Sequence, residues 1–259
     1  MEETVERVTP GTRSWEQYGA EHLQRYRQFA ELYKNKIVID AACGTGYGSA
    51  YIAEQGAGNV TGIDISEEAI LFSQTNYKAP NLSFRLHDCL KIHELGFKAD
   101  LVISFETLEH LPDPALFIKN VSESLNPGGT FICSTPNKER LSGAGNINPF
   151  HPSELSFDEF KETFSRHFTI TSIYHQSETV QYLRYQEIKH LLHQQNSQMR
   201  AFLYNRIELK LRKLFGKTFQ PIQFSRQHLD DLYEEDIYIE PVTRAESWHK
   251  TFILTGTKK

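Results

Sequence analysis

Two hydrophobic periods alternate along the first 175 residues. Short apolar runs bounded by polar residues or glycine predict buried strands at 36–41, 59–64, 82–87, 99–105, 129–134 and 168–174. Segments with helical spacing lie between or before them, at about 14–34, 47–55, 66–77, 113–125 and 156–166. A regular alternation of strands and helices is typical of an α/β fold. We therefore expect a mostly parallel sheet with helices on both faces.

The alternation stops after residue 175. From Val180 to Phe215 the apolar residues recur at helical spacing, an acidic stretch follows at 230–236, and an apolar strand pattern returns at 248–257. This predicts one domain formed by residues 1–175 and 247–259, with a helical insertion or cap at 176–246. The basic face of the segment 200–217 is interpreted as a solvated or homodimer surface, with a membrane surface as the alternative.

A glycine-rich bend follows the first predicted strand. The chain reads Asp40-Ala-Ala-Cys-Gly44-Thr-Gly46, and Asp64 ends the second strand twenty residues after Gly44. Glycines in such a turn allow a ligand to approach the backbone closely. An acid at the end of the next strand is placed to bind the hydroxyl groups of a ribose. The pattern therefore predicts a nucleotide site of the Rossmann-like kind.

The position of Asp40 favours one class of nucleotide. A pyrophosphate needs a positive, amide-lined turn, and an acid at the strand end would repel it. Ser49 also stands where the third glycine of a dinucleotide motif is needed. S-adenosylmethionine carries a positively charged sulfur and no phosphate, so it suits this bend better, and an NAD-dependent oxidoreductase is disfavoured.

Four segments, in order, resemble class I S-adenosylmethionine-dependent methyltransferases. They are the glycine-rich bend, Gly-Ile-Asp-Ile-Ser at 62–66, Phe-Glu-Thr-Leu-Glu-His-Leu-Pro-Asp-Pro at 105–114, and Leu-Asn-Pro-Gly-Gly at 125–129. The resemblance covers about 12–175 and a last strand near 248–257. It implies a seven-stranded sheet in which that last strand is antiparallel. The cofactor contacts that it implies, together with those of the bend, are Tyr18, Asp40, Ala42, Gly44, Thr45, Gly46, Asp64, Ile65, Asp88, Cys89 and Phe105.

Candidate catalytic groups follow the fourth strand. The spacing of Glu106, Glu109 and His110 places them on one side of a helical turn. His110 is interpreted as a general base oriented by a carboxylate, as a purely structural residue, or as a Mg²⁺ ligand together with both glutamates. The magnesium interpretation comes from similar quinone-pathway O-methyltransferases. His151, in the Asn-Pro-Phe-His segment, is a second candidate base, with a hydrogen bond to Glu154 as its structural alternative.

Net charge, cysteine spacing and hydropathy limit the expected partners and location of the protein. The formal net charge of −5 argues against a nucleic acid partner, and the three cysteines have neither disulfide-scaffold nor zinc spacing. No apolar run approaches the roughly 20 residues of a membrane span, and the first residues lack the apolar core of a signal peptide. We therefore expect a cytoplasmic protein with buried free thiols.

The sequence predicts an S-adenosylmethionine-dependent methyltransferase that acts on a hydroxyl group of a sugar, nucleotide-sugar or other small molecule. The sugar class is suggested by similarity to bacterial methyltransferases associated with glycan synthesis. Two alternatives stay open. The first alternative is a magnesium-assisted quinone or phenol O-methyltransferase. The second is a cofactor-binding scaffold without catalysis.

Overall fold

The computed structural model describes residues 8–139, 150–178, 237–242 and 250–259. The chain divides into two compact units, one of residues 1–177 with 239–259 and one of residues 178–238. The second unit lies almost wholly outside the described residues. The helices predicted within 176–246, including the basic segment 200–217, therefore stay a prediction.

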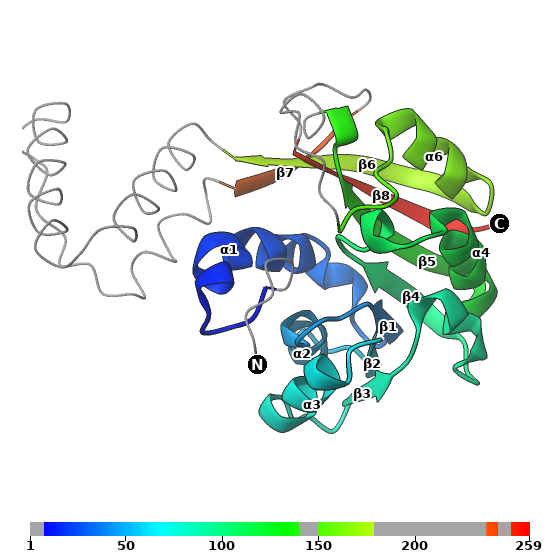
Figure 1. Ribbon diagram of the computed structural model, residues 1–259. Helices are drawn as coiled ribbons and strands as arrows, with labels where there is room; N and C mark the ends of the chain where they lie inside the picture. The colour runs from blue at the N-terminus through cyan, green and yellow to red at the C-terminus, as the bar shows by residue number, and fades with distance from the viewer. Residues whose placement is uncertain (1–7, 140–149, 179–236, 243–249) are drawn as a thin grey trace, which may run out of the picture. The chain divides into compact units, whose positions relative to one another are not determined.

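The described strands form one eight-stranded sheet in the order β3-β2-β1-β4-β5-β8-β6-β7 (Figure 1). The strands are β1 (Ile37–Ala41), β2 (Asn59–Asp64), β3 (Leu82–Leu86), β4 (Ala99–Ser104), β5 (Leu125–Pro136), β6 (Phe168–Glu178), β7 (Ile237–Pro241) and β8 (Thr251–Lys258). The first five strands pair in parallel, and β8 runs antiparallel between β5 and β6. This confirms the mostly parallel sheet and its antiparallel last strand.

The strand count corrects the sequence prediction. We expected seven strands, and the eighth, β7, lies inside the stretch assigned to helices. It is a five-residue strand at one end of the strand order, with Pro241 as its last residue. Such a short edge strand carries too few alternating positions to stand out from its neighbours.

The helices are α1 (Arg13–Gln28), α2 (Tyr47–Glu54), α3 (Glu67–Asn76), α4 (Pro114–Ser124) and α6 (Phe157–Ser165), with short 3₁₀ turns η1 (Ala30–Leu32), η2 (Cys89–Glu94) and η3 (Leu108–His110). Side chains cap the first turns of several of these helices. Ser66 caps α3 through the N–H of Ala69, and Ser156 and Glu159 form a capping box on α6. The first helix is shorter than predicted, because it ends at Gln28 and continues as η1.

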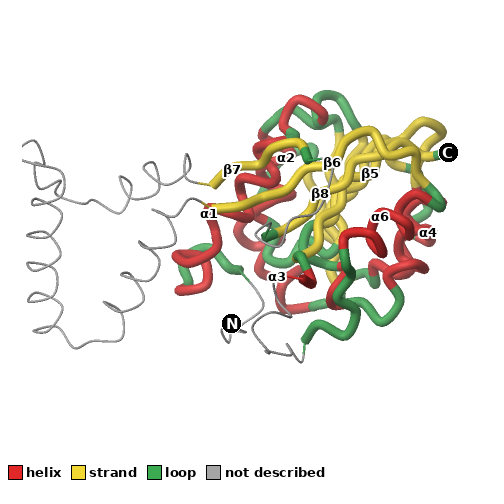
Figure 2. The backbone as a smooth tube through the Cα atoms, turned by 90° about the horizontal axis from the view of Figure 1, so that it is seen from above, coloured by secondary structure: helices red, strands yellow, loops and turns green. Residues whose placement is uncertain are grey.

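The core lies on both faces of the sheet. Successive residues of one strand point to opposite faces, so Val38 packs with α1 and α2 while Ile39 packs with α4 and α6. Figure 2 shows α1 and α2 on one side of the strands and α4 and α6 on the other. Within the described part of the chain, no helix is long and apolar enough to cross a membrane.

The strand order also locates the functional site. The chain moves from β1 outward to β2 and β3, then returns to β4 on the other side of β1. In open α/β sheets, ligands bind beyond the carboxyl ends of the strands where the order reverses in this way. That point lies between β1 and β4, so the bend after Ala41 and the turn after Ser104 border the site.

Candidate functional site

The glycine bend after β1 has a backbone that side chains disfavour. Ala42, Gly44 and Gly46 all have positive φ, at 59°, 55° and 83°. A Cβ atom on Gly46 would lie 2.6 Å from Ser73 Oγ and 2.7 Å from Phe84 Cε1. The backbone here is therefore packed against α3 and β3, and only glycine fits at position 46.

Asp64 ties this bend to the second strand. Its Oδ2 accepts from the N–H of Gly44 at 2.8 Å, and its Oδ1 accepts from the N–H of Ser66 at 2.9 Å. The side chain is largely buried, at the point where the sequence placed a ribose-binding acid. Each carboxylate oxygen has a second lone-pair direction, so these two contacts leave acceptor capacity for ribose hydroxyl groups.

Asp40, the acid at the end of β1, is buried beneath the bend. The hydroxyl groups of Tyr26 and Ser49 donate to its two oxygens, at 3.2 and 2.6 Å. Burial raises the pKa of Asp40 to about 7, although both hydrogen bonds oppose the shift. The sequence identified Ser49 only as the residue that replaces the third glycine of a dinucleotide motif. In the structure its hydroxyl group holds the Asp40 carboxyl group in place.

Helix α1 packs beside the bend through its aromatic residues. The rings of Tyr26 and Phe105 meet edge to face with centroids 4.9 Å apart. Gly48 makes room for Tyr26, because a Cβ there would lie 2.0 Å from Tyr26 Cζ. Phe105 is therefore buried beside the bend, whereas Tyr18, eight residues before Tyr26 in α1, has an exposed side chain. The cofactor contacts expected of both residues stay predictions.

The residues predicted to surround an adenine ring lie at the ends of β2 and β3. Ile65 is 74% exposed directly after Asp64, which is the exposure that an apolar residue covering a ring would need. Asp88 caps η2 by accepting from the N–H of Leu90 at 2.9 Å, so its turn-forming role is present in the structure. Burial raises the pKa of the Cys89 thiol to about 12 and makes this cysteine a poor nucleophile. Thr45 is fully buried, and its hydroxyl group donates to the Val8 carbonyl.

Arg25 of α1 is a site residue that the sequence did not reveal. Its side chain is almost fully buried, its Nε donates to Gln176 Oε1 at 2.7 Å, and its Nη2 lies 3.5 Å from Glu106 Oε2. Its Nη1 is buried without a hydrogen-bond partner among the described residues. An arginine in an amphipathic helix usually faces solvent, so no signal in the sequence separated this one from its neighbours. A buried guanidinium nitrogen without a partner is a fitting contact for an anionic group.

Glu106 does not share a helical turn with Glu109 and His110, contrary to the sequence prediction. It follows β4 with a φ of 50°, before η3 begins. Its carboxylate accepts from Ser134 Oγ at 2.8 Å and faces Arg25. The left-handed backbone turns the Glu106 carboxylate toward Arg25 of α1 and Ser134 of β5. Glu106 is therefore not part of the group in which the ligand atoms of Glu109 and His110 gather.

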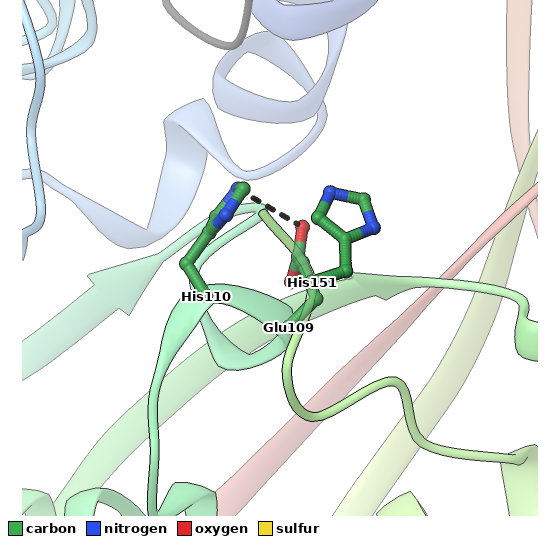
Figure 3. Close-up of side chains that lie close together, drawn as sticks. All are labelled: Glu109, His110 and His151. Carbon is green, nitrogen blue, oxygen red and sulfur yellow. Dashed lines mark ion pairs between the residues drawn. The ribbon is translucent and has the colours of Figure 1, made fainter. Parts of the chain in front are cut away.

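A different trio is assembled, from Glu109, His110 and His151 (Figure 3). One potential ligand atom of each lies within 4.8 Å of the others, and the two imidazole rings meet edge to face with centroids 4.8 Å apart. Ser153 donates its N–H to the Glu109 carbonyl, which fixes the segment carrying His151 against η3. Burial, with Glu106 nearby, raises the pKa of Glu109 well above its usual value.

In both histidines, Nδ1 lies within hydrogen-bond distance of an oxygen atom of the protein. His110 Nδ1 lies 2.9 Å from the Phe150 carbonyl, and His151 Nδ1 lies 3.1 Å from Glu154 Oε1. The second contact is the structural alternative considered for His151. It does not remove His151 from the site, because the same hydrogen bond orients the ring toward His110 and Glu109.

Comparison with known proteins agrees with this architecture. A family described as "Methyltransferase domain" matches residues 32–203. A probable S-adenosylmethionine-dependent methyltransferase of Mycolicibacterium smegmatis is 32% identical over 161 residues, which cover 61% of this chain and 62% of that protein. A ubiquinone biosynthesis O-methyltransferase of Hydrogenovibrio crunogenus is 32% identical over 137 residues, covering 49% and 55%.

The match spans about three fifths of the Mycolicibacterium protein and a little over half of the Hydrogenovibrio protein. Among solved structures, an S-adenosylmethionine-dependent methyltransferase from Mesorhizobium loti aligns with 92% of this chain and 98% of its own, at a TM-score of 0.56 and 17% identity. At that identity the similarity establishes the fold and leaves the substrate open.

Proposed function

This chain belongs to the class I S-adenosylmethionine-dependent methyltransferase family, and on that premise we propose that it transfers a methyl group to a hydroxyl oxygen of a sugar, nucleotide-sugar or other small molecule. The observation that carries the proposal is the glycine bend, in which Asp64 accepts the N–H of Gly44 and the buried carboxyl group of Asp40 lies beneath the backbone. A buried acid beneath this bend disfavours a phosphate and favours a cation. The cofactor supplies a methyl group activated by a positively charged sulfur.

The residues present fit that cofactor. We expect Asp64, which already accepts from the N–H of Gly44, to bind the ribose, and the exposed Ile65 to cover the adenine face. At the other end of the bend, the unpartnered Nη1 of Arg25 would hold the carboxylate of the methionine part. The ionised form of Asp40 would be stabilised by the positive sulfur or ammonium group.

The acceptor side of the proposal rests on Glu109, His110 and His151. Methylation of a hydroxyl group requires loss of its proton, and assistance by a positioned side chain contributes roughly 10²–10⁴-fold in rate. Two imidazoles and a carboxyl group gather where η3 follows β4, at the same end of the sheet as the glycine bend. This cluster is the best-supported group among the described residues for assisting that proton loss.

Binding and turnover of the purified full chain test this function. Calorimetry with S-adenosylhomocysteine should detect binding, and a panel of sugars, sugar nucleotides and phenols should then be compared by thermal shift with that product bound. We expect a hydroxyl compound to raise the melting temperature of the protein further. The same compound should be methylated, with conversion of S-adenosylmethionine to S-adenosylhomocysteine. No binding of either adenosyl compound would refute the proposal.

A second candidate is favoured by the ubiquinone O-methyltransferase similarity. A phenolic hydroxyl is more acidic than an alcohol and needs less help to lose its proton. If only the phenols of the panel are methylated, the phenol O-methyltransferase function replaces the sugar function. Tight binding of the cofactor product without turnover on any acceptor would instead identify a cofactor-binding scaffold.

Replacing Asp64 with alanine should weaken S-adenosylhomocysteine binding by about tenfold or more. The substitution removes charge-assisted hydrogen bonds, which contribute about 1.5–3 kcal/mol each. Asp100→Ala is the matched control, because Asp100 also accepts a backbone N–H, that of Ile37 at 3.0 Å, at the opposite end of β1. Calorimetry should show weaker binding for Asp64→Ala only. Equal dissociation constants for the two variants would remove Asp64 from the cofactor site.

A further inference from the structure

The trio of Glu109, His110 and His151 has the composition of a metal site. Two imidazoles and one carboxylate are ligands that divalent transition metals accept, whereas Mg²⁺ prefers an all-oxygen environment. The three residues come from two segments, η3 and the stretch before α6, that are joined by the hydrogen bond from Ser153 to Glu109. Figure 3 shows the Glu109 carboxyl group between the two rings.

The hydrogen bonds behind the two rings strengthen this interpretation. A histidine that ligates a metal usually gives its other N–H to a carbonyl or a carboxylate, which fixes the tautomer and the ring orientation. His110 has the Phe150 carbonyl at Nδ1, and His151 has Glu154 at Nδ1. A carbonyl or carboxylate oxygen only accepts, so each Nδ1 carries the proton, and the neutral ring then has its lone pair on Nε2.

The carboxyl group is held in a comparable way. Thr135 Oγ1 donates to Glu109 Oε2 at 3.2 Å, and the other oxygen, Oε1, lies 4.0 Å from His110 Nε2. That spacing is wider than a direct hydrogen bond. A tetrahedral ion with bonds of about 2.0–2.2 Å holds its ligand atoms about 3.4 Å apart, so an ion here would draw the two atoms together by about half an ångström.

We propose that Glu109, His110 and His151 bind one divalent transition-metal ion of the Zn²⁺ and Co²⁺ class, through Nε2 of each histidine and Oε1 of the glutamate. Three protein ligands leave at least one coordination position for an oxygen of the acceptor or for water. The site deepens the proposed function, because an ion here would make an acceptor hydroxyl group more acidic. Its occupancy can be measured without cofactor or acceptor.

This site differs from the magnesium trio that the sequence left open as one of three interpretations of His110. Glu106 is engaged by Arg25 and Ser134, and His151 takes the third ligand position. With His151 in place of Glu106, an imidazole replaces a carboxylate among the ligands. The site then prefers a metal ion that binds nitrogen over a hard cation such as Mg²⁺. The proposal therefore predicts which ion binds as well as where.

Metal titration of the full chain tests the site. The chain is stripped with chelator, and Co²⁺ or Zn²⁺ is added alone, with visible absorption recording nitrogen ligation of cobalt. We expect about one ion per chain, little displacement by excess Mg²⁺, and at least tenfold weaker binding for His110→Asn and His151→Asn. His93→Asn is the matched control, because His93 forms a surface pair with Glu94, at 3.9 Å, and should change nothing.

A variant that keeps all three ligands separates loss of metal binding from loss of folding. Glu154→Gln leaves all three proposed ligands in place and removes only the charge behind His151, so metal affinity should fall by about 10–100-fold while the melting temperature stays near wild type. Full cobalt binding by His110→Asn and His151→Asn, or displacement of cobalt by Mg²⁺ at equal concentration, would overturn the proposal. Failure of the methyl-transfer proposal is a separate result, because it is read from binding of S-adenosylhomocysteine.

Discussion

Asp40→Asn should stabilise the folded protein at pH 8 by up to about 4 kcal/mol. Burial raises the pKa of Asp40 from 3.8 to about 7, and every tenfold weakening of its acidity corresponds to about 1.4 kcal/mol. Between about pH 4 and pH 7 the unfolded chain has lost this proton while the folded protein keeps it. The folded protein therefore loses stability as the pH rises through that window, and asparagine, which does not ionise, avoids the loss.

Denaturant unfolding at a series of pH values measures this effect. The difference in free energy of unfolding between Asp40→Asn and wild type should be near zero at pH 4 and reach its full value above pH 7. Asp100→Asn is a control of opposite sign, because hydrogen bonds from Ile37 and Asn126 lower the pKa of Asp100. Its stabilising contribution is present at neutral pH and is lost in acid, so that variant should be less stable than wild type at pH 8. A pH-independent difference for Asp40→Asn would show that Asp40 is ionised without penalty.

The same variant should bind the charged cofactor less well. A positively charged sulfur near Asp40 favours the ionised carboxylate, so affinity for S-adenosylmethionine should increase from pH 6 to pH 8 in wild type. S-adenosylhomocysteine has a neutral sulfur and should show a smaller increase. Such a buried acid thus trades stability for cofactor recognition, a pattern that functional sites commonly show.

His151→Asn should lower turnover by about 10²–10⁴-fold and leave S-adenosylhomocysteine affinity within about twofold of wild type. The reason is the position of the ring, which lies against His110 and beside Glu109 in the cluster proposed for the acceptor side. Removal of one imidazole abolishes the cluster, whether the cluster acts as a base or through a bound ion. Turnover is measured with the acceptor found by the panel, together with calorimetry on the same preparation.

The response to chelator and the control variant complete that test. His93→Asn, at an exposed surface pair, should keep wild-type turnover. A loss for His151→Asn that added chelator reproduces in wild type would favour the ion, whereas a loss insensitive to chelator would favour a base. Full turnover by His151→Asn would remove this residue from the acceptor site.

Much of the fold was predictable because local signals agreed with the final structure. Apolar runs at β1, β2 and β4 are buried on both faces, so they form continuous hydrophobic strands in the sequence. Ser66 and Ser156 cap the helices that follow them, which is the local chemistry that a serine before a helix provides. The strand β7 was missed because five residues at a sheet edge carry little periodic signal.

The glycine bend and the acid that binds it were predictable for the same reason. Gly44, Gly46 and Asp64 are close in sequence to the strands that position them, so their spacing already implies the clamp seen between Asp64 and Gly44. Asp40 was identified by the same spacing, but its burial under Tyr26 and Ser49 was not, because Tyr26 comes from a helix that precedes the sheet.

The sequence by itself determined the first six strands with the helices between them, the last strand, the glycine bend and the acids on either side of it, because these depend on local spacing. Tertiary structure alone decided which charged side chains meet. Arg25 meets Glu106 across 81 residues of chain, and His151 joins Glu109 and His110 through a segment about 40 residues further on. The physical reason is that such pairings depend on sheet topology and on a left-handed backbone at Glu106, neither of which leaves a pattern at short range.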